Sequence, residues 1–88
     1  MSNVNEISNR HLRTIGKAAE WLRIVDSETP IRYSTIRNAV LDNKINCVAV
    51  GAKRLVLLED VYRYFYGTDI DPEIVDKSIA YQKINQGA

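Results

Sequence analysis

With 88 residues, 45% of them apolar and 26% charged, the chain has the size and composition of one globular domain with a modest core. No apolar run approaches the roughly 18–20 residues that cross a bilayer, and the first ten residues lack the basic and apolar segments of a secretory signal. A single cysteine excludes an internal disulfide, so we expect a cytoplasmic protein with no membrane contact.

Charge is distributed unevenly along the chain, although the net formal charge is only +1. Residues 1–58 carry nine Lys and Arg against five Asp and Glu, a net charge of +4. Residues 59–88 carry three against six, a net charge of −3. This asymmetry indicates a first part that faces a polyanion and a separate acidic part, and a chance division of the charges is the alternative.

Two helices separated by a polar loop are predicted in the first half of the chain. Thr14 is a suitable cap for a helix over residues 15–24, although Lys17 stands where a capping box needs an acid. Trp21 lies close to the apolar face and is expected to pack at its edge. The residues at helical spacing that form this buried face are Ile15, Ala18, Ala19 and Leu22.

The second helix follows a loop that ends in Pro30, and it begins at Tyr33 or Ser34, with Ser34 the better cap. It should end near Asn43, because asparagine tolerates the left-handed conformation that terminates helices. The residues expected on its buried face are Ile36, Ala39 and Val40, and those on its polar face are Ser34, Arg37, Asn38 and Leu41.

A β-hairpin and two more helices are predicted in the second half. The segments INCVAV and RLVLL are rich in β-branched and aliphatic residues, and the glycine-containing turn at residues 51–53 is typical of a hairpin. A third helix opens at Glu59, where negative charge suits a helix N-terminus, and ends at Gly67. A fourth begins with the DPE sequence at residues 71–73 and runs to about Lys83. The apolar residues expected to face the core from these two helices are Leu58, Val61, Tyr62, Phe65, Ile74, Val75, Ile79 and Tyr81.

The predicted order of helix, turn, helix, hairpin and helix is that of a winged helix-turn-helix with an added C-terminal helix. We therefore expect a mainly α protein with a small β-hairpin, an α+β class. Three parts are expected: a flexible N-terminus over residues 1–11, a winged helix-turn-helix domain over residues 12–67 and a C-terminal helical extension over residues 68–88. The hairpin is then the wing, and cations at its tip can reach a phosphate backbone.

Double-stranded DNA is the partner that this fold and its charges indicate. In helix-turn-helix proteins the second helix enters the major groove, where Arg reads guanine and Asn reads adenine through paired hydrogen bonds. The recognition residues expected here are Arg32, Ser34, Thr35, Arg37 and Asn38. Lys53 and Arg54 should reach phosphates or the minor groove from the wing. Further candidates for phosphate contacts are Arg13, Lys17 and Lys44. A solvated helix face and a turn kept soluble by two cations are the alternatives.

Nothing in the sequence indicates an enzyme, a metal site or a cofactor site. Zinc needs about four ligands, whereas the chain has one histidine, His11, and one cysteine, Cys47. Cys47 lies in a predicted strand and is expected to be a small core residue, with no motif that supports a nucleophilic pair with His11. The acids within residues 69–76 are explained better by helix capping and by the helix dipole than by a metal.

The segments TIGKAAEWL and STIRNAVLDNKINCVAVGAKRLVLLEDVYRYF resemble the excisionase-type helix-turn-helix family, which is related to MerR-like winged helices. The features in common are a Thr-capped helix with an Ala-Ala pair, a recognition helix that begins Ser-Thr-aliphatic-Arg, a wing with Val-Gly before its cations, and an acid-led closing helix. The resemblance covers about residues 12–67. The loop before the second helix is several residues longer than the tight turn usual in that family.

This resemblance implies a small, non-enzymatic DNA-binding protein of a phage or mobile element. Excisionases, also called recombination directionality factors, bind and bend attachment-site DNA and assist an integrase. A small transcription regulator of the same fold is one alternative. A protein-interaction module, such as an anti-repressor or assembly factor, is another, and it would use its acidic C-terminal third without binding DNA. The C-terminal helix is a candidate contact for an integrase, a recombinase or a second copy of the chain.

Overall fold

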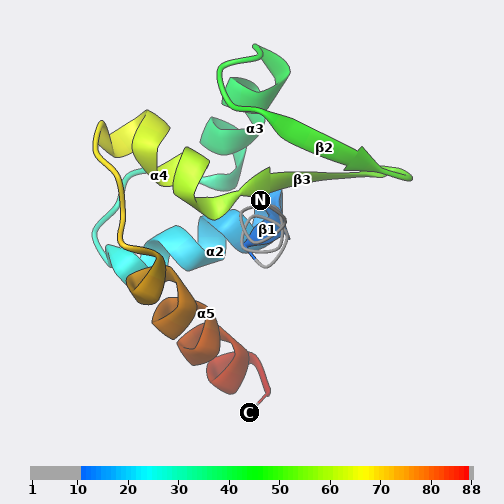
Figure 1. Ribbon diagram of the computed structural model, residues 1–88. Helices are drawn as coiled ribbons and strands as arrows, with labels where there is room; N and C mark the ends of the chain where they lie inside the picture. The colour runs from blue at the N-terminus through cyan, green and yellow to red at the C-terminus, as the bar shows by residue number, and fades with distance from the viewer. Residues whose placement is uncertain (1–10, 88) are drawn as a thin grey trace, which may run out of the picture.

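A three-stranded antiparallel sheet and four helices make up residues 11–87, the part of the chain that the computed structural model describes, with side chains described for residues 11–84 (Figure 1). In chain order the elements are β1 (Leu12–Thr14), α2 (Ile15–Val25), α3 (Tyr33–Leu41), β2 (Cys47–Val50), β3 (Lys53–Leu57), α4 (Leu58–Tyr66) and α5 (Pro72–Gly87). The mixed α+β class is confirmed. Residues 1–10 of the flexible N-terminus expected over residues 1–11 lie outside the described residues, whereas His11 is buried.

The sheet has the order β1-β3-β2, so the predicted hairpin is joined by a strand that the sequence did not reveal. Val50 pairs with Lys53 at the end of the hairpin, which leaves Gly51 and Ala52 as a two-residue turn. Gly51 has a φ of 61°, the positive value that a type II′ turn requires at its first central residue. β1 has only three residues, too few for an alternating pattern, and its pairing with β3 defines it.

The hairpin is buried at its base and exposed along its edge. Val56 in β3 has no exposed surface, whereas every residue of β2 is exposed. β2 pairs only with β3 and therefore forms an edge of the sheet. Cys47 is the first residue of this edge strand and is exposed, so the expectation of a core cysteine is wrong.

Helix α2 starts as predicted and buries the predicted face. The Thr14 hydroxyl accepts a hydrogen bond from the Lys17 backbone N–H at 3.3 Å. Trp21 has no exposed surface, so its expected place at the edge of the face is wrong. Its ring packs edge-on against Tyr62 with centroids 6.4 Å apart, and its Nε1–H donates to Ser78 Oγ at 2.6 Å. This last partner comes from α5, far away in the sequence, and the spacing within α2 does not reveal it.

Helix α3 begins one residue before the predicted cap. Arg32 occupies the N-cap position, and its backbone N–H donates to Thr35 Oγ1 at 3.3 Å, so Ser34 lies inside the helix and is not its cap. Ile36 is fully buried on the predicted apolar face. Asn43 follows the helix with a φ of 63°, which confirms the predicted end. The opposite, polar face of α3 is exposed along its length.

The long loop between α2 and α3 is held by a tyrosine from α4. The Tyr66 hydroxyl donates to Asp26 Oδ2 at 2.8 Å and lies 2.8 Å from Thr29 Oγ1. Thr29 is buried, and its hydroxyl oxygen accepts the Ile31 backbone N–H at 3.2 Å. The Tyr66 ring stacks on Tyr62 with centroids 4.5 Å apart. These contacts fix the loop and therefore the position from which α3 starts.

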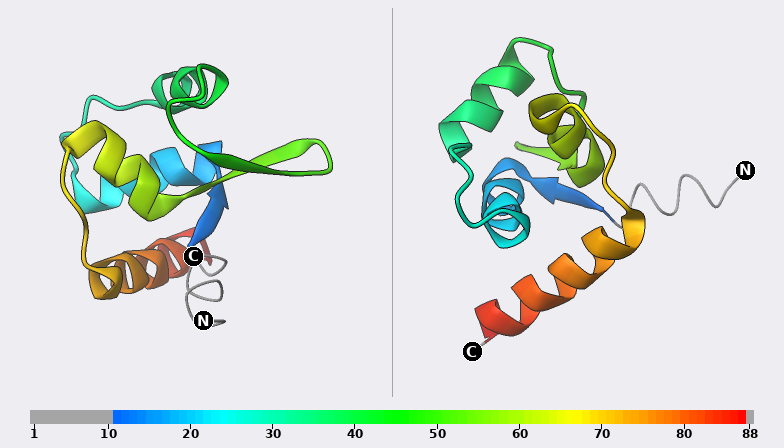
Figure 2. Two further views of the ribbon diagram at one scale, coloured as in Figure 1. Left: turned by 45° about the horizontal axis from the view of Figure 1, so that its top comes forward. Right: turned by 90° about the vertical axis from the view of Figure 1, so that its left-hand side faces the viewer.

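Helix α4 ends at Gly67, as predicted, with a left-handed φ of 75°. The start of α5 is also confirmed, because Asp71 Oδ1 accepts the Glu73 backbone N–H at 2.9 Å. Helix α5 continues to Gly87, beyond the predicted end near Lys83. Both views in Figure 2 place α5 on the side of the molecule away from α3, with α2 between them.

The face that α5 buries is only partly the predicted one. Val75 is fully buried and Ile79 is half-buried against the core, but Ile74 and Tyr81 are 50% and 58% exposed, so their assignment to the buried side is wrong. The rest of the buried side is polar and consists of Ser78 and Gln82. Polar side chains are stable there because α2 supplies hydrogen-bond partners: Trp21 Nε1 for Ser78, and the Lys17 carbonyl for Gln82 Nε2 at 3.3 Å.

Candidate nucleic-acid interface

Three of the predicted DNA-contacting residues line one open groove of about 490 Å³ between α3, the hairpin tip and the start of α2. Arg37 comes from the exposed face of α3, and Lys53 and Arg54 come from the first two positions of β3. All three side chains are exposed. The fold therefore brings Arg37 together with two cations that lie 16 and 17 residues further along the sequence.

The positions of these cations follow from local structure. Ile36 is buried on α3, and the next position, Arg37, therefore points away from the core. Lys53 and Arg54 directly follow the turn and pair with Val50 and Ala49 of β2. At this place in the hairpin both residues line the groove that Arg37 also lines.

Arg32 and Ser34 lie beside a second groove, of about 540 Å³, on the other side of Tyr33. Arg32 Nη1 donates to the Thr29 carbonyl at 2.8 Å, which anchors this guanidinium to the loop. Arg23 from α2 lines the same groove and was not predicted to belong to the site. Thr35 is only partly exposed, and its hydroxyl oxygen accepts the Arg32 backbone N–H, so this residue stabilises the start of α3.

Tyr33 is the surface residue that sequence reasoning missed as a member of the site. Its side chain is 51% exposed, and it lines both grooves together with Gly16. A Cβ atom at Gly16 would lie 3.9 Å from the Tyr33 ring, so the two are in close proximity. The sequence feature that could have indicated Tyr33 is its position as an aromatic residue at the exposed start of α3. Asn38, which was predicted, is exposed on the same helix.

The three further candidates for phosphate contacts are not among the described residues that line the two grooves. Arg13 is half-buried in β1, and its Nη1 donates to the Leu12 carbonyl at 2.6 Å. Lys17 is exposed on α2, with its Nζ 3.9 Å from Glu20 Oε1. Lys44 is exposed just after α3. Among the described residues, Arg37, Lys53 and Arg54 line the first groove together, and Arg23 and Arg32 line the second.

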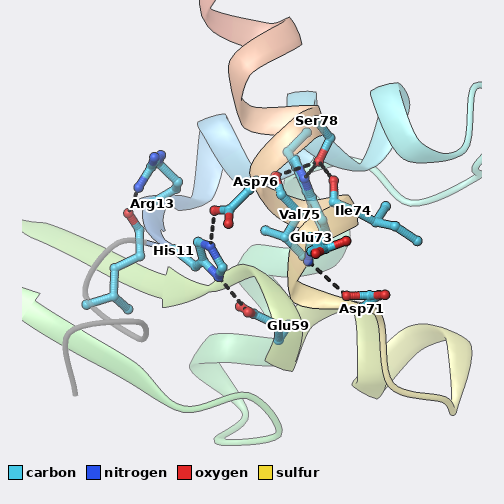
Figure 3. Close-up of polar contacts among 11 residues, drawn as sticks. His11, Arg13, Glu59, Asp71, Glu73, Ile74, Val75, Asp76 and Ser78 are labelled. Carbon is cyan, nitrogen blue, oxygen red and sulfur yellow. Dashed lines mark hydrogen bonds and ion pairs between the residues drawn. The ribbon is translucent and has the colours of Figure 1, made fainter. Parts of the chain in front are cut away.

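The sequence did not indicate a polar cluster that His11, Glu59 and Asp76 form on the side of the molecule where α5 lies (Figure 3). His11 is 1% exposed, and its ring nitrogens bond to two carboxylates, Nδ1 to Glu59 Oε2 at 2.5 Å and Nε2 to Asp76 Oδ1 at 2.8 Å. The roles expected for His11 from the sequence were limited to a metal ligand and the partner of Cys47 in a nucleophilic pair, and neither was favoured. Among the described residues, no group of three His, Cys, Asp or Glu side chains has a geometry that suits a metal ion.

The acids of residues 69–76 have separate roles, so capping and the helix dipole do not account for all of them. Asp71 caps α5, as expected. Asp69 accepts a hydrogen bond from Arg63 Nε at 2.6 Å, and this bond raises the pKa of the exposed Arg63 guanidinium. Asp76 binds His11.

Comparisons of the chain with models of protein families, with curated proteins and with solved structures gave no match. None of the helices in the described part of the chain has the length and apolar character needed to cross a membrane.

Proposed function

We propose that this chain is a sequence-specific DNA-binding protein of the winged helix-turn-helix type, and most specifically an excisionase that binds and bends attachment-site DNA and assists an integrase. A small transcription regulator of the same fold is the alternative within this class. The observation that carries the proposal is the convergence of Arg37, Lys53 and Arg54 on one open groove. Cations gathered on an exposed surface are the electrostatic feature that a phosphate backbone requires.

Helix α3 is the element that we assign to the major groove. Its exposed face carries Arg37 and Asn38, whose side chains form the paired hydrogen bonds that distinguish guanine and adenine. The hairpin beside it carries Lys53 and Arg54 at its end and acts as the wing, in contact with phosphates or the minor groove. Arg32, anchored on the loop, contacts the backbone at the other end of α3.

Bending is the part of this proposal that depends on the resemblance to excisionases. A smooth bend over a binding site costs about 1–6 kcal/mol, which contacts from both the helix and the wing can offset. Contacts from two elements that lie at an angle to each other reach more of a bent duplex than of a straight one. The proposed DNA bend is therefore a consequence of the helix and the hairpin tip binding at the same time.

Fluorescence anisotropy of a labelled mixed-sequence duplex, titrated with the protein at low and at physiological salt, tests the proposal. If about five cations neutralise phosphates, the logarithm of the binding constant falls with the logarithm of the salt concentration with a slope of about −4 to −5. A search for the specific site and for bending follows such a result. If the protein fails to bind even at low salt, DNA is not its partner.

A protein-interaction module remains the second candidate, because α5 presents apolar side chains to solvent. Ile74, Tyr81 and Ile84 are 50%, 58% and 73% exposed and recur along the outer side of the helix. An apolar helix surface of this kind suits a helical segment of a partner protein, such as an integrase. The DNA titration separates the two candidates, because an interaction module of this kind does not bind the duplex even at low salt.

A further inference from the structure

His11 connects three parts of the fold that are distant in the sequence. It directly precedes β1, Glu59 lies in the first turn of α4, and Asp76 lies in α5 (Figure 3). The Glu59 side chain is 14% exposed and that of Asp76 is 45% exposed. Within the described residues Glu59 Oε1 is buried without a hydrogen-bond partner, so His11 is the one group that compensates the burial of this carboxylate.

The two bonds of the imidazole require two protons. A protonated imidazole has an N–H on each nitrogen and donates to both carboxylates, whereas a neutral imidazole has only one N–H. When the neutral ring faces two ionised carboxylates, one nitrogen lone pair points at a carboxylate oxygen. Both nitrogens lie within 2.8 Å of carboxylate oxygens, a geometry in which a protonated imidazole donates a hydrogen bond to each.

Other charged groups on the elements that pack around His11 are engaged elsewhere or exposed. In β1 the Arg13 guanidinium bonds to the Leu12 carbonyl. In α4 the Asp60 carboxylate bonds to Arg63. On α5 the neighbouring charged residues, Glu73 and Lys77, are exposed. Among the charged groups of the described residues, the carboxylates of Glu59 and Asp76 are the ones that the structure places in hydrogen-bond contact with the imidazole.

The attachment of α5 to the rest of the fold is largely polar, so this cluster contributes a large part of it. Val75 is the one fully buried apolar side chain among the described residues of α5. Ile79 packs half-buried against the core, and the other anchors are hydrogen bonds: Asp76 to His11, Ser78 to Trp21, and Gln82 to the Lys17 carbonyl. An element held by few apolar contacts opens at a lower free energy than the core does.

We propose that His11 is a pH-sensitive latch that holds α5 on the domain. With the imidazole protonated, β1 and α4 are tied to α5 through the two carboxylates. Loss of the proton removes one of the two bonds and places a lone pair against a carboxylate, and α5 then separates from α2. The separation takes Ser78 away from Trp21 and exposes the indole. This latch does not depend on DNA binding.

The direction of the pH dependence follows from proton linkage. The docked state holds a proton that the undocked state releases, so docking weakens as the pH rises through the range in which the imidazole loses its proton. For one linked proton, the docking equilibrium constant falls by at most about tenfold for each pH unit.

The chain provides a reporter for each half of this process, because it has one tryptophan and one histidine. The test uses the full chain without a histidine tag. Emission and acrylamide quenching of Trp21 report the separation of α5, and the imidazole proton signal of His11 in NMR spectra reports protonation. The expected result is that Trp21 becomes more quenchable as the pH rises, with the same midpoint as the His11 titration, while the amide signals of Ile36 and Val61 stay in place.

Two matched variants of α5 acids sharpen the test. In Asp76→Asn the amide either accepts from or donates to the imidazole, so the bond no longer depends on the extra proton and the pH response of Trp21 is lost or greatly reduced. Glu73→Gln removes an exposed acid from the same helix and keeps the full response. A Trp21 signal that is constant over this pH range overturns the latch, and so does an Asp76→Asn response equal to that of the unmodified chain. If the Ile36 and Val61 signals are lost at the same midpoint, the whole domain unfolds and α5 does not separate alone. This result also overturns the latch.

Discussion

The groove beside α3 and the cluster around His11 both gather charged side chains from distant segments, but they differ in exposure and in partners. Arg37, Lys53 and Arg54 are exposed on an open surface, whereas His11 is 1% exposed and contacts a carboxylate through each ring nitrogen. Exposed cations contribute little to stability and are available to a ligand. A buried charged group contributes to stability only as long as its partners remain. The groove cations are therefore available to a ligand, whereas the His11 cluster stabilises the fold.

His11→Phe is the substitution with the largest expected effect, because it leaves the Glu59 carboxylate buried without compensation. Removal of one partner from a buried charged pair typically costs about 3–5 kcal/mol, and we expect a loss of this size in the free energy of unfolding measured with urea. Arg54→Ala is the control from the other region and should change the same quantity by less than about 0.5 kcal/mol. Equal effects of the two variants would contradict the distinction between the regions.

Arg37→Ala tests the exposed region and should act on binding alone. Loss of a base contact costs about 1–3 kcal/mol, a weakening of the dissociation constant by about 5- to 150-fold, together with a relaxed base preference at one position. Anisotropy titrations with the specific duplex measure this effect. Lys83→Ala, which removes an exposed cation from α5, is the matched control and should bind as the unmodified chain does. If both variants bind equally well, α3 does not read bases.

Tyr66→Phe tests the polar contacts that position α3 and should have a smaller effect on stability. The hydroxyl bonds to Asp26 and Thr29, and the loss of such bonds costs about 1–2 kcal/mol in the free energy of unfolding. Burial raises the pKa of Tyr66, the Thr29 hydroxyl acts in the opposite direction, and Asp26 raises it further. The folded state therefore holds the phenol proton more tightly than the unfolded chain does.

The sign of the pH dependence follows from this raised pKa of Tyr66. Its contribution to stability is fully present below about pH 10, the unfolded value, and is lost as the pH rises through the folded pKa. Urea denaturation between about pH 8 and pH 11 should show this loss in the unmodified chain and not in Tyr66→Phe. Tyr64→Phe, at a half-exposed position on the same helix, should retain it. An identical alkaline profile for both variants would show that Tyr66 is not the group responsible.

Local patterns predicted most of the secondary structure, because each depends on residues close in the sequence. The Thr14 cap, the left-handed Asn43 and Gly67, and the glycine in the hairpin turn all follow from neighbouring residues. The elements that local patterns do not determine were missed or misplaced. β1 exists through its pairing with β3, and Arg32 takes the cap position because Thr35 accepts its N–H.

The same reasoning explains which parts of the sites were predicted. Exposed cations at a helix face and a hairpin turn are visible in the sequence, and the fold brings three of them to one groove. Trp21 and His11 are buried and find their partners across the fold, in Ser78, Glu59 and Asp76, so neither periodicity nor spacing indicates these contacts. For the same reason, Cys47 looked apolar enough for the core, although it lies on an edge strand.

Replacement of Lys53 and Arg54 together by alanine should have the smallest effect on affinity at a single salt concentration. The variant is recognised instead by a change in how strongly its affinity depends on salt. Each phosphate contact contributes about one unit to the slope of log K against log salt, so the double variant should have a slope less steep by about two. The matched control replaces Lys77 and Lys83 of α5, which are exposed on the other side of α2.

The two double variants have the same net charge, so long-range electrostatic attraction changes by a similar amount in both. A difference between their slopes therefore measures the position of the cations, and it requires that the hairpin tip lies at the phosphate backbone. Equal slopes for the two variants would mean that the hairpin attracts DNA only as part of the general field of the protein. In that case α3 would be the only contact, and simultaneous binding by helix and hairpin, on which the proposed bend depends, would not occur.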